Sequence, residues 1–565
     1  MPNPRLPLSV VMAGALMAGS SVAMAAEVTV VSAARIHTVD PDQPQAQAMA
    51  YDEAGRILAL GTTDALLARF PEAARIDAGA GTIVPGLIDA HGHVGDLGEA
   101  RMIADLIGAA GKEDVVQRLQ AFAQTNPGDG WLVGNGWDQN DWPERRFPTA
   151  ADLDDAFPER PVWLVRVDGH AGWANSAALR AVERELQGDW QPEGGRIERD
   201  QQGRPTGILV DAAMQLVDDV RPAPDAATVE RMLTLGMQAA VAAGLTGVHD
   251  AGVPLAELRA YQRLADRGAL PLRITAMADG DDQALAELCR TGRYRHASGR
   301  LQMRTVKLYA DGALGSRGAA LLQDYSDDPG NRGLMVMSPQ QLLAAAGKAS
   351  RCGVQVATHA IGDRGNHEVL AVYEQVLGEQ AAGDHRWRIE HAQVLAPQDL
   401  PRLAQLRVIA SMQPTHATSD MPWAEDRLGA DRIGGAYAWR QVRDSGARLA
   451  LGSDFPVESV EPRLGLYAAT TRADADGNPP GGWRPQEKLS PEEALRGFTL
   501  DAAYAGFAEG EVGSLEPGKR ADFVILGEDP LSVPPGQLRT LSVRATYVDG
   551  KPVYEAGKAG SAATP

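Results

Sequence analysis

The chain has 565 residues, of which 44% are hydrophobic and 23% charged. This length suits a barrel domain with an accessory domain, and the composition excludes a largely disordered protein. Lys and Arg number 54 against 74 Asp and Glu, so the formal net charge is −20. Because so acidic a surface repels phosphate backbones, we expect no nucleic acid partner.

The first 26 residues have the pattern of a secretory signal peptide. Met1 to Arg5 carries one positive charge, Leu6 to Met17 is mainly apolar, and Ala23-Met24-Ala25 supplies the small residues of a cleavage site. The apolar run is too short for a permanent membrane span. We expect an exported protein with no stable membrane span after cleavage, periplasmic if the host is a Gram-negative bacterium. A retained membrane anchor is the alternative.

Both ends of the remaining chain read as short strands. Residues 27–81 and 506–557 contain β-prone apolar runs separated by turn residues, and Asp549-Gly550 is a hairpin signal. We expect a small β-sandwich domain formed by both termini, followed by a flexible tail over residues 558–565.

Residues 82–505 alternate apolar β-runs with helical stretches rich in Ala and Leu. This alternation predicts an α/β fold with a parallel sheet, and eight strands are the number that a (β/α)8 TIM barrel needs. We predict the strands near residues 82–91, 245–250, 272–278, 304–311, 354–359, 387–391, 407–413 and 448–454.

The first two predicted strands are about 150 residues apart, whereas a βα unit needs roughly 30. We therefore expect an insertion subdomain after the first barrel strand, at about 110–240. It is rich in tryptophan: Trp131, Trp137, Trp142, Trp163, Trp173 and Trp190. Active sites of such barrels form where the strands end, so we expect the insertion to cap the site. The alternative is an insertion whose tryptophans fill its own core.

Histidines, a lysine and an aspartate stand at or near the ends of the predicted strands. His91 and His93 follow the first apolar run, and residues i and i+2 of an extended segment point to the same face. Lys307, His359, His391 and Asp454 hold similar positions in later strands. Burying these groups without partners would be costly, and a metal centre is the simplest way to satisfy them.

Several stretches give a specific resemblance. They are PGLIDAHGH at residues 85–93, KLYADGALGSR at 307–317, THAIGD at 358–363, IEHA at 389–392, GSDFPV at 452–457 and GSLEPGKRAD at 513–522. With these motifs the chain resembles the amidohydrolase superfamily, in its YtcJ-like branch related to N-substituted formamide deformylases. The resemblance covers nearly all of the chain after residue 26.

The resemblance implies one or two divalent metal ions of the zinc type. The implied ligands are His91, His93, Lys307, His359, His391 and Asp454. It also implies that Asp454 is the general base and that a carboxylated Lys307 bridges two ions. The alternative for Lys307 is a charged group beside a single ion. His359 or His391 would be a ligand or would donate a hydrogen bond to the oxyanion.

The implied function is hydrolysis of a non-peptide amide or N-substituted formamide bond in a small molecule, with a hydroxide activated by the metal. The superfamily implies a homodimer, for which no feature of the sequence is diagnostic. We expect His170, Trp137, Asp138 and Arg317 to contact the substrate. For His170 the alternative is a structural role. For Arg317 the alternative is a loop carboxylate as its partner in place of a substrate carboxylate. We expect His249 to have no metal role and the other histidines, His416 among them, to be surface or packing residues.

Three alternatives remain. A deaminase on the same fold usually has a glutamate soon after the fifth-strand histidine, whereas here Asp363 follows His359 in the sequence HAIGD. An esterase or lactonase would use the same hydroxide. A non-catalytic binding scaffold would typically have lost ligands. The two cysteines, Cys289 and Cys352, fit either one disulfide or two buried thiols.

Overall fold

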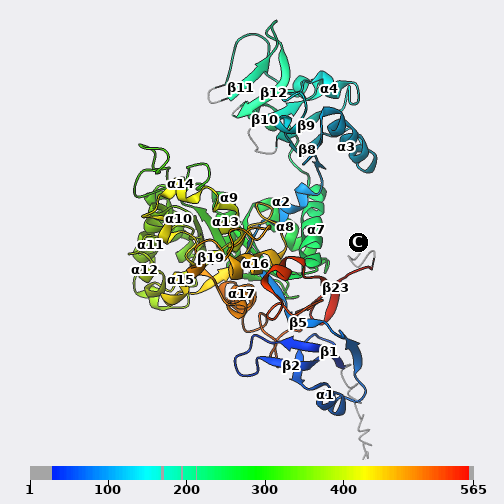
Figure 1. The fold of residues 1–565 in the computed structure, drawn as a ribbon, viewed down its shortest axis with the longest axis vertical. Helices are drawn as coiled ribbons and strands as arrows, with labels where there is room; N and C mark the ends of the chain where they lie inside the picture. The colour runs from blue at the N-terminus through cyan, green and yellow to red at the C-terminus, as the bar shows by residue number, and fades with distance from the viewer. Residues whose placement is uncertain (1–27, 167–170, 193–194, 212, 559–565) are drawn as a thin grey trace, which may run out of the picture.

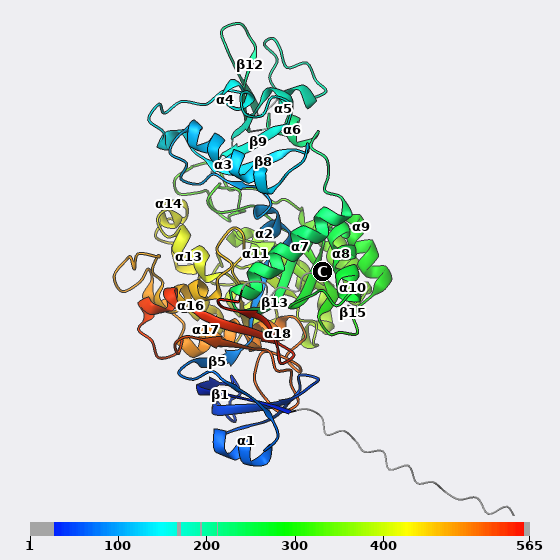
Figure 2. The ribbon, with the colours of Figure 1, turned by 90° about the vertical axis from the view of Figure 1, so that its right-hand side faces the viewer.

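The computed structural model describes residues 28–166, 171–192, 195–211 and 213–558. The expected signal peptide, His170 and most of the expected tail lie outside these ranges. Figures 1 and 2 show an elongated molecule with the barrel in the middle, a β-rich part at one end and the insertion at the other. Among the described helices, none combines the length and the apolar character needed to cross a bilayer.

Eight barrel strands lie where they were predicted, but the first is shorter than predicted. They form a parallel sheet in the order β20-β19-β18-β17-β16-β14-β13-β6. Their bounds are β6 Leu87–Gly92, β13 Leu245–Val253, β14 Arg273–Asp279, β16 Leu301–Tyr309, β17 Gln355–Ala360, β18 Arg388–His391, β19 Ile409–Met412 and β20 Leu449–Leu451. Nearly every residue of these strands is buried, as expected for strands covered by helices outside and packed side chains inside.

The backbone pairing between the first barrel strand, β6, and the last, β20, is not completed. Asp89 joins the two strands through its side chain. Its carboxylate accepts hydrogen bonds from the backbone N–H of Ser453, at 3.0 Å, and from the Ser453 hydroxyl, at 2.6 Å. It also accepts from the backbone N–H of His91, at 3.0 Å. Burial raises the pKa of Asp89 to about 6. Asp89 therefore fixes the segment after β20, which carries Asp454, beside the strand that carries His91.

The helices around the barrel follow the strands in turn. They are α2 Val94–Ala100, α7 Ala226–Ala242, α8 Leu255–Asp266, α9 Asp282–Thr291, α10 Pro339–Arg351, α11 Asp363–Leu377, α12 Leu400–Gln405, α13 Pro414–Asp420, α14 Ala424–Leu428, α15 Trp439–Asp444, α16 Pro462–Thr471, α17 Pro491–Gly497 and α18 Leu500–Ala505. Cys289 of α9 is disulfide-bonded to Cys352, which follows α10. The bridge, one of two arrangements that the sequence left open, ties two neighbouring outer helices together.

The two ends of the chain are hydrogen-bonded in one eight-stranded sheet, in the order β23-β22-β21-β5-β1-β2-β3 with β4 beside β1. Its strands are β1 Val28–His37, β2 Gln45–Asp52, β3 Ile57–Gly61, β4 Ala74–Asp77, β5 Thr82–Pro85, β21 Phe523–Leu526, β22 Val543–Val548 and β23 Lys551–Glu555, and α1 Thr63–Arg69 follows β3. The N-terminal strand β5 pairs antiparallel with the C-terminal strand β21, so both termini do build one β-rich unit.

One predicted strand is two strands. Residues 82–91 were expected to form the first barrel strand, but β5 belongs to the terminal sheet and only β6 enters the barrel. The chain changes sheet at Gly86, where a Cβ atom would lie 2.1 Å from the Thr246 hydroxyl oxygen. The Gly86 N–H still donates to the Asp522 carbonyl at 2.9 Å, and only glycine fits so close an approach to Thr246.

The insertion is a separate layer with its own six-stranded sheet, in the order β11-β12-β10-β9-β8-β7. Its elements are β7 Ala104–Asp105, α3 Lys112–Thr125, β8 Leu132–Trp137, α4 Ala151–Asp154, β9 Val162–Arg166, β10 Ala171–Ala174, α5 Ser176–Ala181, β11 Gly195–Arg199, β12 Pro205–Asp211 and α6 Gln215–Asp218. It starts earlier than the expected residue 110 and ends before 240, because α7 packs against α2 and α8 of the barrel. It lies on the side of the barrel where the strands end (Figures 1 and 2).

Candidate metal centre

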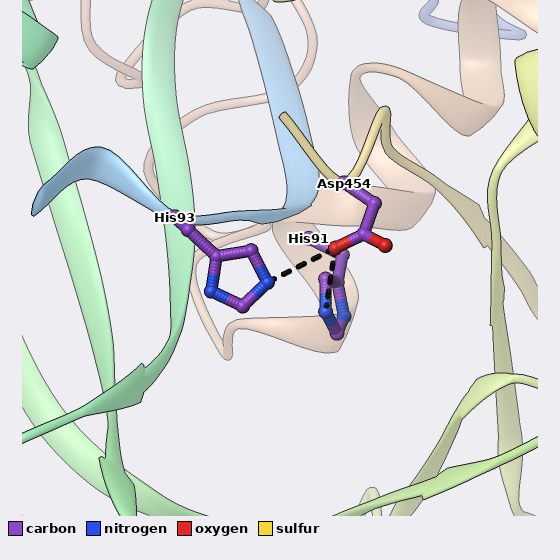
Figure 3. Close-up of side chains that lie close together, drawn as sticks. All are labelled: His91, His93 and Asp454. Atoms are coloured by element: carbon purple, nitrogen blue, oxygen red, sulfur yellow. Dashed lines mark hydrogen bonds and ion pairs between the residues drawn. The ribbon is translucent and has the colours of Figure 1, made fainter. Parts of the chain in front are cut away.

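The carboxyl end of the barrel brings together histidines from four elements with one lysine and one aspartate. In the first group, Asp454 Oδ1 lies 3.0 Å from His93 Nε2 and 3.4 Å from His91 Nε2 (Figure 3). His91 is fully buried, and the side chain of His93 is 25% exposed. These three residues, from β6, the start of α2 and the segment after β20, can offer ligand atoms to one cation.

Three further predicted residues adjoin this group. Lys307 of β16 is buried, and its Nζ lies 3.2 Å from His91 Nε2. The ring of His391 is centred 4.9 Å from that of His91 and 4.6 Å from that of His359. All six predicted ligands are therefore gathered at one mouth of the barrel.

His416 is a site residue that the sequence reasoning missed. It was expected to be a surface or packing residue, but its Nε2 lies 3.5 Å from Asp454 Oδ2 and it forms a second potential metal group with His391 and Asp454. It stands in α13, three residues after the predicted seventh strand ends at Gln413. The same strand-end rule that selected the other residues would have found it if applied one helical turn further.

The donors fit a divalent cation. Nε2 of His359 and Nε2 of His416 are buried, and neither has a hydrogen-bond partner among the described residues. A buried polar atom without a partner costs free energy. Imidazole nitrogens and carboxylate oxygens are the ligands that zinc and similar ions take in proteins. A bound ion would satisfy both orphaned nitrogens.

The protonation states agree with metal binding. Burial lowers the pKa of His391 well below 6.5, that of His91 to about 4 and that of His359 to about 3. Burial acts to raise the pKa of Asp454, but the hydrogen bond from His93 and the nearby histidines hold it well below 3.8. His91, His359 and His391 are thus neutral imidazoles and Asp454 is a carboxylate, the forms that bind a cation, whereas the hydrogen bond with Asp454 raises the pKa of His93.

Two candidate ligands lie on left-handed backbone, where non-glycine residues are uncommon: φ is 72° at His391 and 65° at Asp454. The turn at His391 breaks the strand alternation, in which only every second side chain points inward. Arg388 and Glu390 therefore point into the barrel, and His391 still reaches the mouth. Glu390 was missed from the sequence because alternation would place it on the face opposite His391.

The other described histidines lie away from the metal centre. His249 was expected to have no metal role, and its Nδ1 lies 2.9 Å from an Arg388 nitrogen. His37 pairs with Asp529. Three more contact nearby groups elsewhere, His296 with Asp266, His367 with Asp399 and His385 with the Leu406 carbonyl.

Trp137 was predicted to contact the substrate. The structure instead places it in the core of the insertion. Its side chain is fully buried, its Nε1 donates to the Leu164 carbonyl at 2.9 Å, and its ring packs 6.0 Å from Trp142 and 5.9 Å from Trp173. The alternative, in which the tryptophans fill the insertion's own core, is the observed one for this residue.

Trp137→Ala is expected to destabilise the insertion by about 3–5 kcal/mol, because a large buried ring leaves a cavity. Limited proteolysis or hydrogen exchange of residues 104–211 measures the change. The control Trp190→Ala removes a half-buried ring stacked on Arg184, and we expect a smaller effect. Equal effects of the two substitutions would contradict the core assignment.

The remaining predicted substrate contacts are held by neighbours. Arg317, in the loop after β16, forms an ion pair of 2.9 Å with Asp327, the loop carboxylate that the sequence left open as its partner. Asp138 pairs at 2.8 Å with Arg166 within the insertion. Neither residue is grouped with the candidate ligands described above.

Two exposed apolar side chains stand in loops at the carboxyl end of the barrel. Val336 and Val457 are 58% and 71% exposed, in the loops after β16 and β20. The Val336 N–H donates to the Ala310 carbonyl at 2.8 Å, and the Val457 N–H to the Asp454 carbonyl at 3.0 Å. The other large exposed hydrophobic residues among those described are Ile107, Leu322 and Leu334. Apolar side chains thus flank the ligand-bearing segments on two sides.

A half-buried acid beside α2 makes stability depend on pH. Burial, with the nearby carboxylate of Asp250, raises the pKa of Glu257 to about 8 from 4.5. The folded state then holds a proton that the unfolded state loses, so its contribution is fully present below pH 4.5 and is lost as pH rises through about 8. We expect Glu257→Gln to raise the melting temperature relative to the native protein at pH 9 and not at pH 4. Glu287→Gln on exposed α9 is the control, and a pH-independent difference would contradict the assignment.

A parallel eight-stranded barrel with histidine, lysine and aspartate donors at its carboxyl mouth defines the class of barrel hydrolases that use a metal centre. Comparison with known proteins identifies the family. The profile described as "Amidohydrolase family" matches residues 74–554. The chain belongs to the amidohydrolase family, and the predicted resemblance is confirmed.

Individual relatives agree. The chain is 33% identical over 521 residues to YtcJ of Bacillus subtilis, covering 89% of this chain and 95% of that one. It is 31% identical over 541 residues to an N-substituted formamide deformylase of Arthrobacter pascens, covering 92% and 97%. An uncharacterized metal-dependent hydrolase from Pyrococcus horikoshii has a similar structure, with a TM-score of 0.76, 26% identity and coverage of 90% and 99%.

Proposed function

We propose that the protein hydrolyses a non-peptide C–N bond, of the amide or N-substituted formamide type, in a small molecule. The observation that carries this proposal is the approach of both Asp454 oxygens to histidines, Oδ1 to His91 and His93 and Oδ2 to His416. The deformylase activity named for the Arthrobacter relative supports the bond type.

One or two divalent cations, zinc by the chemistry of the donors, would be held by His91, His93, His359, His391 and Asp454. When bound, such an ion supplies Lewis acidity and lowers the pKa of water to about 7. Asp454 then accepts the proton of the attacking water and returns it to the leaving nitrogen. His416, whose Nε2 lies 3.5 Å from Asp454 Oδ2, would be a further ligand.

A carboxylated Lys307 is part of this proposal. Burial lowers the pKa of Lys307 below 10.5, against the opposing effect of Glu390 and Asp454. A neutral amine is the form that adds carbon dioxide, and the resulting carbamate oxygens could bridge two ions where an ammonium could not. The position of Nζ, 3.2 Å from His91 Nε2, would bring those oxygens to the ligand groups.

The exposed apolar side chains of Val336 and Val457 favour substrates with an apolar substituent on nitrogen or on the acyl carbon. A matched series of N-alkyl and N-benzyl formamides, amides, esters and aminopyrimidines separates the proposed activity from an esterase or a deaminase. The proposal requires the highest kcat/KM on an amide or formamide. Turnover of esters or aminopyrimidines alone would replace it, and binding without product would indicate a scaffold.

Lys307→Ala tests the bridge. We expect about two equivalents of zinc in the native protein and one or fewer in the variant, because the bridging group is lost. Elemental analysis with and without added bicarbonate measures this, and Lys348→Ala, on the outer helix α10, is the control. One equivalent in both proteins would indicate a single ion with Lys307 beside it. No metal in the native protein would contradict the hydrolase proposal itself.

We further propose that the protein is exported, and periplasmic in a Gram-negative host. The charged, apolar and small-residue pattern of residues 1–26 supports this, and so does the Cys289–Cys352 disulfide, since such bonds persist in oxidising compartments. Cell fractionation with N-terminal sequencing decides: a mature protein that keeps residues 1–26, or one that stays in the cytoplasm, contradicts the proposal.

A further inference from the structure

The metal centre has two ends, one at His91 and one at His391. The two histidines have different hydrogen-bond partners. His91 Nδ1 is hydrogen-bonded to Glu390 Oε2, and both side chains are fully buried. His391 Nδ1 lies 2.8 Å from Gln413 Oε1, also buried. One histidine is thus backed by a carboxylate and the other by a neutral amide.

The Glu390 carboxylate is itself fixed by Arg388, two residues earlier on the same inward face of β18. Arg388 pairs with both Glu390 oxygens, donates to Ser411 Oγ at 2.7 Å, and contacts His249 Nδ1 at 2.9 Å. The Arg388 side chain is only 1% exposed. Glu390 therefore has no freedom to leave His91, and its charge is balanced without water.

A carboxylate behind a ligating histidine fixes the tautomer with the proton on the far nitrogen, orients the ring and makes the free nitrogen a stronger ligand. Here the nitrogen left free is His91 Nε2, which faces Asp454 and Lys307. An amide carbonyl behind His391 fixes the same tautomer without adding charge.

We propose that Glu390, held by Arg388, is a positioning residue that makes the His91 end of the metal centre bind its cation more tightly than the His391 end. This inference rests on the metal centre of the proposed function and adds an order of occupancy to it. The ion beside His91 and His93 is then the resident one, and an ion at His391 is the first to leave.

The order in which the two ions leave is tested on the zinc-loaded full chain, with a chromophoric chelator that competes for the zinc. The native protein should release zinc beside His391 first and retain the ion beside His91. Glu390→Gln is expected to weaken the retained ion by about 10–100-fold. The matched control Gln413→Leu, which removes the buried partner of the other histidine, should leave the retained ion unchanged. Equal zinc affinity in Glu390→Gln and the native protein would overturn the inference.

Two further sets of variants distinguish a positioning role of Glu390 from a general effect of its substitution on folding. The pair Arg388→Met with Glu390→Gln leaves no unbalanced charge, so it keeps the test open if Glu390→Gln alone does not fold, and it should show the same loss of affinity. In a His91→Gln background, Glu390→Gln should have no further effect on zinc affinity, because Glu390 acts through His91. Additive losses would show that Glu390 acts otherwise. A native protein without zinc would instead remove the proposed function.

Discussion

Asp454→Asn is expected to reduce kcat by about 10²–10⁴-fold, because the amide cannot take the proton from water. The side chain keeps its size and one oxygen, so the fold and the hydrogen bond from His93 should persist. Steady-state kinetics on the best formamide substrate, together with zinc analysis of the same sample, separates loss of the base from loss of metal.

The control for this prediction is Asp501→Asn. Asp501 is also buried, but it lies 3.6 Å from Arg448 at the opposite end of β20. Turnover of this variant should stay near that of the native protein. If Asp454→Asn retained turnover within about tenfold while keeping its zinc, the general base would have to be another group.

Arg388→Met alone is expected to lower the free energy of unfolding by about 3–5 kcal/mol, because Glu390 remains as a buried charge without its counterion. Arg388 also gives up its hydrogen bonds to Ser411 and to the Ala90 carbonyl. The shift of the urea midpoint, followed by near-ultraviolet circular dichroism, measures the effect.

Adding Glu390→Gln to Arg388→Met should recover much of that stability, since neither charge remains. Arg290→Met, which breaks an exposed pair with Glu287 on α9, should change the midpoint little. Full stability of the single Arg388→Met variant would mean that water or another cation reaches Glu390, contrary to the burial of the pair.

The barrel could be predicted because its strands are buried on both faces and so form continuous apolar runs, each ending in a polar residue. That rule located His91, Lys307, His359, His391 and Asp454. It failed where the backbone departs from regular geometry. The left-handed turn at His391 hides the inward direction of Glu390, and a helical turn separates His416 from its strand.

Pairing between segments that are distant in the chain was the other feature that could not be predicted from the sequence. Nothing local in residues 82–91 shows that Pro85 pairs with Phe523 while Leu87 pairs with Leu245 in the barrel. Likewise, tryptophan enrichment indicated a packed insertion, but whether Trp137 faces its core or a ligand depends on contacts with Trp142 and Trp173. A single sequence records composition and spacing, and these contacts are set only by the fold.

The pairing of β5 with β21 also bears on when the protein can fold. The ribosome makes β5 early and β21 almost last, so the central strand pair of the terminal sheet cannot form until nearly the whole chain has been synthesised. Contacts so distant along the chain are slow to form because the loop between them must first be ordered. The terminal sheet is therefore among the last parts of the protein that can be completed.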